Sequence, residues 1–332
     1  MLRIKLEMDP GFTDRGEVLL REASALRDLG LDFAADMPAP HLTFVHESVV
    51  QASVAEGVER TEPLVIFERQ ASATLGVNVG PRAMIQKSNV VGWVKEHTLR
   101  DVSIHNAPLY LGRHHYGLMA PDAEPRSYKR PIQVSDADLA KIGLAVPHYL
   151  NPMFDTAREL KCRDISVRKV QVMYAGTVKY NFAPLQDHRM QCCQAIQDLD
   201  ATHKVIGIGR SFQPRFFNEL LRDTKIFVSP YGWGEYSWKD YEAIYAGCVL
   251  VKPRSSFVAT AGFDIFDEGK YCVECKPDFS DLQEVVDKIL NDQAAYAEFA
   301  QRARQSLMAA TAVEVWAPQT VAYFNRAAAL IH

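Results

Sequence analysis

The chain has 332 residues, of which 48% are hydrophobic and 23% charged, a composition typical of a soluble globular protein. This length exceeds what one core usually serves, so it predicts two domains. The formal net charge of -4, without a long basic run, argues against general nucleic-acid binding, and we expect no nucleic-acid partner. A locally basic groove remains compatible with that charge.

The first nine residues carry charges inside an apolar run, which a signal peptide does not. No stretch approaches the ~18 uninterrupted apolar residues of a transmembrane segment. The sequence therefore predicts a cytoplasmic protein, compatible with association with the inner face of a membrane. Its six cysteines are then expected to be reduced, and Cys272-Val-Glu-Cys275, which lacks a second such pair, is interpreted as structural.

The N-terminal half alternates between helical and strand patterns. Apolar residues between positions 18 and 29 recur at helical spacing and end at Gly30. Short strands are predicted at residues 42–45, 64–67, 89–94 and 102–104. This half is interpreted as an abbreviated Rossmann-type layer. Residues 108–136, which contain several prolines and many charges, are predicted as loops, and the domain linker is predicted within 147–165.

The C-terminal half alternates more regularly. Strands are predicted at residues 169–175, 204–208, 226–229 and 248–251, and helices at 187–199, 216–223, 281–291 and 293–308. This alternation predicts a parallel sheet with helices on both faces and a ligand at the carboxyl ends of its strands. Gly176-Thr177, Gly209-Arg210 and residues 229–235 would then lie on one rim. The tail, 313–331, is amphipathic.

The most informative segment is residues 229–253, which combines a glycine turn, a short helix and a strand. Gly232 and Gly234 allow close approach of the backbone to a ligand. Tyr241, Ile244 and Tyr245 recur at helical spacing, and Gly247 ends that helix. A glycine turn that leads into a helix N-terminus suits a phosphate, because free N–H groups and the helix dipole both face the anion.

Residues Glu242-Ala-Ile-Tyr-Ala-Gly247, followed by Cys248-Val-Leu-Val-Lys-Pro253, resemble the donor-binding half of GT-B glycosyltransferases. Gly-Trp-Gly-Glu before Lys-Asp-Tyr-Glu-Ala is similar to a bacterial polysaccharide-type branch. The resemblance implies two Rossmann-like domains facing across a cleft. It places an acceptor-side domain at residues 1–155 and a donor-binding domain at 156–312, with the terminal helix, 313–332, packed back onto the first domain.

This resemblance implies a metal-independent transferase that moves a sugar from a nucleotide-sugar to a saccharide or glycan acceptor. The nucleotide-sugar is then the donor substrate, and no other cofactor is expected. A GT-B-like sugar-nucleotide epimerase and a catalytically silent binding protein remain alternatives. Acceptor-dependent release of nucleotide would distinguish the transferase from the epimerase, and any turnover would argue against the silent protein.

By the same resemblance, Glu242 holds the ribose hydroxyls and the two glycines lie near the diphosphate. Many retaining members carry a second glutamate eight positions before the first. Here that position is Gly234 and the acid is Glu235, seven positions earlier, which could meet the sugar hydroxyls or cap the helix. A leaving diphosphate gains negative charge, so cations near it stabilise the transition state. The candidates are Arg210, Lys179 and Lys252, together with Gly176 and Thr177.

An inverting transferase also needs a general base from the N-terminal domain. Glu68, at the end of the strand predicted at 64–67, is one candidate, and His46 with Glu47, after the strand predicted at 42–45, is another. His97, His105, His114 and His115 are further candidates. No carboxylate accompanies these histidines at the spacing of metal ligands, so no metal site is predicted.

Overall fold

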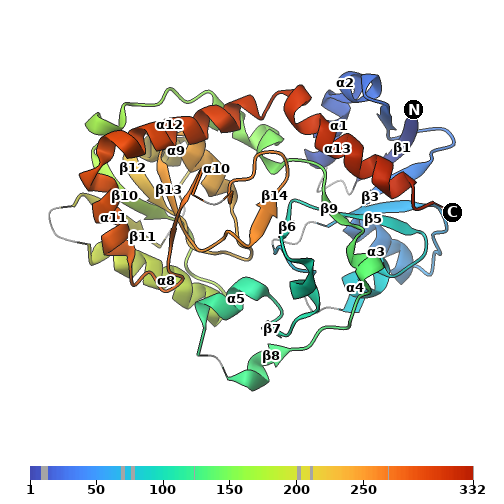
Figure 1. Ribbon diagram of the computed structural model, residues 1–332, viewed down its shortest axis with the longest axis horizontal. Coiled ribbons are helices and arrows are strands. Elements are labelled where there is room, and N and C mark those ends of the chain that lie inside the picture. The colour runs from blue at the N-terminus through green and yellow to red at the C-terminus, as the bar shows by residue number, and fades with distance from the viewer. Residues whose placement is uncertain are drawn as a thin grey trace.

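The chain forms two parallel β-sheets, each covered by helices (Figure 1). The computed structural model describes residues 1–332 except 9–13, 69–71, 76–78, 123, 200–202, 210–211, 268 and 332. The α/β class with two Rossmann-like domains, predicted from the sequence, is confirmed. Arg210, one of the predicted diphosphate ligands, lies outside the described residues.

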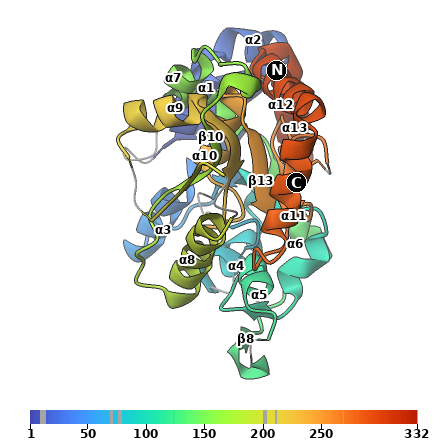
Figure 2. The same cartoon turned by 90° about the vertical axis from the view of Figure 1, so that its left-hand side faces the viewer.

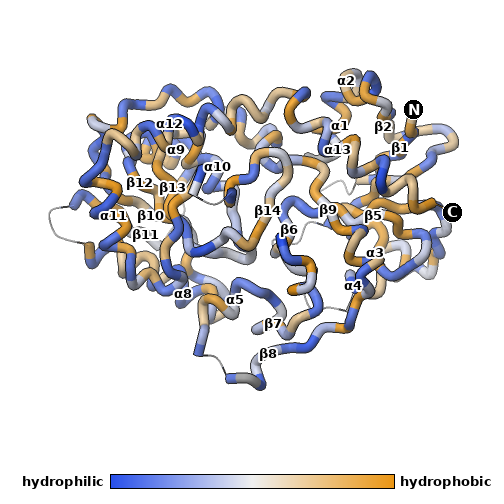
Figure 3. The backbone as a smooth tube through the Cα atoms, in the orientation of Figure 1, coloured by the Kyte–Doolittle hydropathy of each residue, from blue (hydrophilic) through white to orange (hydrophobic). Residues whose placement is uncertain are grey.

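The N-terminal sheet has the strand order β2-β1-β3-β4-β5-β9, and its pairings are parallel. Its strands are β1 (Leu2–Glu7), β2 (Leu31–Ala34), β3 (Leu42–His46), β4 (Leu64–Phe67), β5 (Val90–Lys95) and β9 (Ile142–Leu144). The inner strands β3, β4 and β5 are buried along their whole length, as expected of parallel strands covered on both faces. Figure 3 shows hydrophobic residues concentrated around β5 in this sheet.

The helices of this half are α1 (Asp14–Arg21), α2 (Ala23–Asp28), α3 (Glu47–Ala55), α4 (Val79–Ile85) and α6 (Asp136–Leu139). Residues 102–104, predicted as a strand, belong instead to the 3₁₀ helix η1 (Val102–Asn106). Asp101 favours this turn because its carboxylate accepts the Ser103 N–H at 2.9 Å. The segment predicted as loops contains β7 (Leu109–Tyr110), α5 (His114–Met119), η2 (Pro125–Ser127) and β8 (Tyr128–Lys129).

The C-terminal sheet has the strand order β11-β10-β12-β13-β15, again with parallel pairings. Its strands are β10 (Val170–Ala175), β11 (Val205–Ile208), β12 (Thr224–Val228), β13 (Val249–Pro253) and β15 (Val273–Cys275). Its helices are α8 (Ala183–Gln197), α9 (Pro214–Arg222), α10 (Trp238–Tyr245), α11 (Leu282–Asn291) and α12 (Gln293–Ala309). The core of this sheet is aliphatic, with Val172, Ile226 and Val249 fully buried.

Several segments join the two halves. The chain passes between the sheets through η3 (His148–Leu150), η4 (Pro152–Phe154), α7 (Asp155–Arg158) and η5 (Ile165–Val167). The short strands β6 (His97–Leu99) and β14 (Val258–Thr260), one from each half, form an antiparallel ladder. Residues far apart in the sequence are thereby held side by side at the junction.

The last helix, α13 (Val313–Ala328), follows α12 along one side of the molecule and reaches the N-terminal sheet (Figures 1 and 2). Phe324 packs edge-on against Phe33 and Phe44, with ring centroids 5.3 and 5.5 Å apart. A β-carbon on Gly143 would lie 2.4 Å from the Tyr323 ring, so β9 needs glycine where this helix docks. In the part of the chain that the structure describes, no helix combines the length and apolar character needed to cross a membrane.

Candidate active-site cleft

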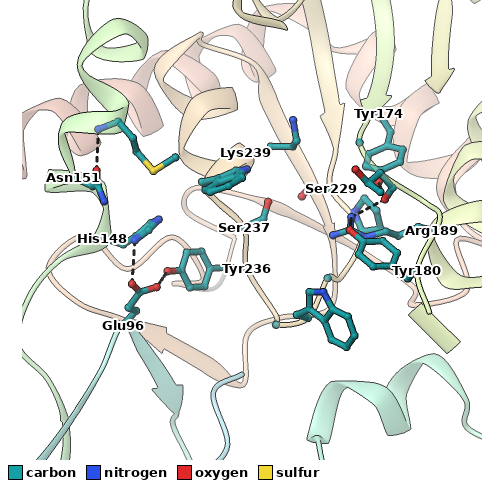
Figure 4. Close-up of a pocket in the computed structure, with 18 residues that line it drawn as sticks. Glu96, His148, Asn151, Tyr174, Tyr180, Arg189, Ser229, Tyr236, Ser237 and Lys239 are labelled. Atoms are coloured by element: carbon teal, nitrogen blue, oxygen red, sulfur yellow. Dashed lines mark hydrogen bonds and ion pairs between the residues drawn. The ribbon is translucent and has the colours of Figure 1, made fainter. Parts of the chain in front are cut away.

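A cleft of about 490 Å³ lies between the two halves (Figure 4). On one side it is lined by the ends of β10 and β12, the glycine turn that follows β12, and the start of α10. On the other side it is lined by Glu96, directly after β5, and by His148, Asn151 and Met153 from the connecting segment. The cleft therefore sits at the carboxyl ends of parallel strands, where open α/β sheets hold their ligands.

The C-terminal wall carries a fixed arginine. Arg189, on α8, donates from Nε to the Tyr231 carbonyl at 3.0 Å and from Nη1 to the Thr177 carbonyl at 2.9 Å. Its guanidinium also lies over the Tyr180 ring, 5.0 Å from the centroid. A β-carbon on Gly232 would come within 2.6 Å of Arg189 Nη2, so the glycine lets the cation pack directly against the turn.

The start of α10 forms the floor of this wall. Ser237 precedes the helix, and its N–H donates to the Asp240 carboxylate at 2.9 Å, as in a capping box. Lys239 follows in the first turn, with its ammonium 3.6 Å from the centroid of the Phe217 ring. Burial lowers the pKa of Lys239 below its ordinary value, although the charge of the neighbouring Glu242 opposes this shift. A helix N-terminus, a lysine and an arginine thus line the same space.

The N-terminal wall carries a carboxylate–imidazole pair. Glu96 Oε1 lies 3.3 Å from His148 Nδ1, and Tyr236 donates its hydroxyl to Glu96 Oε2. Figure 4 shows these three side chains pointing toward one another at one end of the cleft. A carboxylate that accepts Nδ1–H fixes the imidazole tautomer that has its lone pair on Nε2. This arrangement is typical of a general base held by an orienting acid.

None of the general bases predicted from the sequence lines the cleft, including the further candidates His97, His105, His114 and His115. Glu68 is fully buried, forms an ion pair with Lys95 at 2.9 Å and accepts the Trp93 Nε1–H. His46 ends β3, where its Nδ1 accepts the Ser48 N–H at 3.2 Å as the N-cap of α3. Both side chains belong to the interior of the N-terminal half, so the expectation that one of them points at the donor is not met.

Glu235 is also fully buried and lies outside the lining of the cleft. Its carboxylate accepts the Ala73 N–H at 2.8 Å, and it lies 2.9 Å from His115 Nδ1 and 3.2 Å from His97 Nε2. Burial alone would raise its pKa. The charge and hydrogen bond of His115, with the hydrogen bond of His97, instead hold the pKa of Glu235 well below its usual range. The residue joins the glycine turn to the N-terminal half, and the capping box of α10 is formed by Ser237 and Asp240.

Only some of the residues predicted to bind the donor line the cleft. Gly176, Thr177, Gly232 and Gly234 all line the cleft. Lys252 does not, because it is fully buried in an ion pair with Asp240 at 3.1 Å.

Glu242 is half-buried one helical turn beyond Trp238 and Lys239, which line the cleft, and is not itself part of the lining. The pKa of Glu242 is raised, mainly by burial. The positive charge of Lys239 opposes this shift, and the negative charge of Asp240 adds to it. Its predicted contact with a ribose remains a prediction. Lys179 is not among the lining residues either.

The sequence offered little sign of Arg189 or of the Glu96–His148 pair. Arg189 is an ordinary arginine within a helical pattern, and His148 lies in a proline-bearing connection. Glu96 follows a predicted strand, as a catalytic acid often does, and that position was the available signal.

Among the described residues, no group of three or more His, Cys, Asp or Glu side chains is arranged to hold a metal ion. Cys272 and Cys275 are free thiols, and burial raises the pKa of both.

Comparison with protein-family models finds no match for this sequence, and comparison with curated proteins finds none. Among solved structures, an α-glucosyltransferase in complex with UDP-glucose and DNA containing an abasic site is 10% identical, over 95% of this chain and 97% of that chain, with a TM-score of 0.45. A glycosyltransferase from Rickettsia africae is 8% identical, over 98% and 96%, with a TM-score of 0.44. A putative UDP-N-acetylglucosamine 2-epimerase from Listeria monocytogenes is 9% identical, over 88% and 76%, with a TM-score of 0.40. Identities and TM-scores this low carry no information on the substrate of this chain.

Proposed function

We propose that the protein is a glycosyltransferase that moves a sugar from a nucleotide-sugar to a saccharide or glycan acceptor without a bound metal. One observation carries this proposal. A single cleft has fixed cations and a glycine turn on one wall and a carboxylate-oriented histidine on the other. Glycosyl transfer needs both, because negative charge develops on the departing diphosphate while the acceptor hydroxyl loses a proton.

The diphosphate would lie against the C-terminal wall. Arg189 and Lys239 supply positive charge there, and the N-terminus of α10 adds backbone N–H groups and its dipole. Glu242, one turn further along α10, would accept the ribose hydroxyls, as its resemblance to the donor-site glutamate implies. The exposed side chains of Trp233 and Trp238, 45% and 51% accessible, give the cleft aromatic faces on which a ring can stack.

In the transfer step, the bond between the anomeric carbon and the diphosphate oxygen breaks, and a bond to the acceptor oxygen forms. His148 Nε2 takes the acceptor proton, and Glu96 stabilises the imidazolium that results. The nucleoside diphosphate leaves with the bonding electrons, next to Arg189 and Lys239. A base on the face opposite the leaving group favours inversion at the anomeric carbon. By resemblance, we assign the acceptor to bacterial cell-surface polysaccharides and the reaction to the cytoplasm.

The proposal is tested with the full-length protein and a panel of nucleotide-sugars, following nucleotide release with and without oligosaccharide acceptors. We expect ligands that bind the folded state to raise the melting temperature and acceptors to stimulate release. A chelator should leave the rate unchanged. Conversion of the sugar-nucleotide without an acceptor would indicate an epimerase, and binding without any turnover would indicate a silent binding protein. Loss of activity in chelator, restored by a divalent metal, would contradict the metal-independent mechanism.

A further inference from the structure

Helix α5, which follows the N-terminal strands in the chain, lies against α8 of the C-terminal half (Figure 1). The guanidinium of Arg113, its N-cap, lies 5.9 Å from the Trp233 ring centroid. The His114 ring meets Phe257 at 4.8 Å, and the Tyr116 ring meets Phe182 at 5.1 Å. The N-cap and two residues of this short helix therefore contact three different segments of the C-terminal half.

His115 lies at the centre of these contacts and is fully buried. Its Nδ1 is 2.9 Å from Glu235 Oε1, and its Nε2 is 3.4 Å from the Gly232 carbonyl oxygen. Both neighbours can only accept a hydrogen bond when Glu235 is ionised, so both contacts are satisfied when the ring carries two protons. The imidazolium then donates a charge-assisted hydrogen bond to Glu235 and a second hydrogen bond to the Gly232 carbonyl oxygen.

Two neighbouring histidines, His188 and His114, do not supply that charge. Burial lowers the pKa of His188, which faces the pair from α8, to about 3. Burial also lowers the pKa of His114 on α5. On β6, His97 has its Nε2 3.2 Å from Glu235 Oε2, and its Nδ1 has no hydrogen-bond partner among the described residues. Tyr231, from the turn, packs against the His115 ring at 5.4 Å.

We propose that His115 is a positioning residue. It holds the turn from Gly232 to Glu235 in the conformation that binds the nucleotide, through a charge-assisted hydrogen bond to Glu235. The inference rests on the proposed function for the identity of the ligand, but the state of the turn can be measured without one. Gly232 and Gly234 line the cleft beside Arg189, so an anchor on both ends of this turn fixes the N–H groups that would meet a diphosphate. Glu235 keeps the Ala73 N–H and His97 when His115 is lost, so the fold should survive.

The first measurement uses the free protein. The ¹⁵N shifts of the His115 ring, assigned by comparison with His115→Asn, should show both nitrogens protonated at neutral pH. Hydrogen exchange of residues 231–236 should be slow in the wild type and at least about tenfold faster in His115→Asn, which keeps one donor toward Glu235 but loses the charge and the bond to Gly232. A singly protonated ring, or unchanged exchange, would overturn the inference.

The second measurement uses uridine diphosphate as the probe. We expect its dissociation constant to rise about tenfold in His115→Ala and less in His115→Asn, while the adjacent control His114→Asn stays within about twofold of the wild type. Equal affinities for all variants would contradict the positioning role. A wild type that binds no nucleotide, with the ring and exchange results as expected, would contradict the proposed function and leave the anchoring of the turn supported.

Discussion

The hydroxyl of Tyr236, on the C-terminal side of the cleft, donates to the carboxylate of Glu96 on the N-terminal side. The other oxygen of Glu96 faces His148, so the C-terminal half directly supports the orientation of the candidate base. The C-terminal wall of the cleft and the candidate base are thereby coupled through one carboxylate.

We expect Tyr236→Phe to lower the turnover rate about tenfold, because one hydrogen bond of about 1.4 kcal/mol no longer holds Glu96. The affinity for nucleotide should change little, since the hydroxyl faces the base and not the cations. Steady-state kinetics with a saturating donor, together with nucleotide titration by calorimetry, separate the two quantities. A variant with normal turnover and weakened nucleotide binding would show that Tyr236 serves the donor site instead.

His148→Gln should lower the transfer rate about 10²- to 10⁴-fold, the usual contribution of a general base, and should leave nucleotide binding nearly unchanged. The ring also packs against Phe154 and Tyr236, with centroids 5.4 Å apart in both cases, so thermal unfolding must show that the variant remains folded. The exposed His41, replaced in the same way, is the matched control. A folded His148→Gln variant with the rate of the wild type would remove the residue from the mechanism.

Arg189→Met should weaken binding of uridine diphosphate about 10- to 100-fold, because hydrogen bonds from a charged donor contribute about 1.5–3 kcal/mol. Arg189→Lys should restore only part of the loss, since a lysine cannot hold the Tyr231 and Thr177 carbonyls with one planar group. Arg27→Met, on the surface helix α2, is the control for a lost positive charge. Calorimetric titration checks all three, and equal affinities for wild type and Arg189→Met would place the diphosphate elsewhere.

The sequence predicted the C-terminal half well because apolar residues recur at different spacings in its strands and its helices. Glycines also mark the ends of several of these elements. The strand predicted at residues 226–229 is β12 (Thr224–Val228), and Gly247, predicted to end the helix, has a φ of +68°. The N-terminal half was predicted less completely. Strand β1 (Leu2–Glu7) alternates charged and apolar residues and was not recognised, since parallel strands are usually apolar throughout.

Side-chain partners could not be predicted from the sequence, because they are set by contacts between segments far apart in the chain. Lys252 and Glu68 follow or end predicted strands and looked like cleft residues, yet each is buried against an opposite charge, Asp240 and Lys95. Tyr236 and Glu96 are 140 positions apart, and no local pattern relates them.

Glu242→Ala should weaken nucleotide binding by about 1–3 kcal/mol, the usual cost of losing hydrogen bonds to a charged group. The fold should persist, because the side chain is only half-buried. Burial also raises the pKa of Glu242, which means that its charged form is disfavoured in the folded protein and its removal should cost little stability. Comparison of a ribonucleotide with its 2′-deoxy form sharpens the test, since a carboxylate on the ribose should distinguish them in the wild type and not in the variant. Unchanged affinity for the ribonucleotide in a folded variant would end this assignment.

We expect the stability of the protein to depend on pH because of Glu47, at the start of α3. Burial, followed by the charge of Glu68, raises the pKa of Glu47 from 4.5 to about 7. The folded state then holds a proton that the unfolded state releases, so the free energy of unfolding should fall as the pH rises from about 4.5 to about 7 and level off above that range. The shift corresponds to about 3 kcal/mol at most, and Glu47→Gln should recover part of it at pH above 7. Chemical denaturation across this range measures the effect, and Glu56→Gln, at the exposed end of the same helix, is the control. If the wild type and Glu47→Gln lose stability in parallel as the pH rises, the buried carboxyl group of Glu47 is not the source of the dependence.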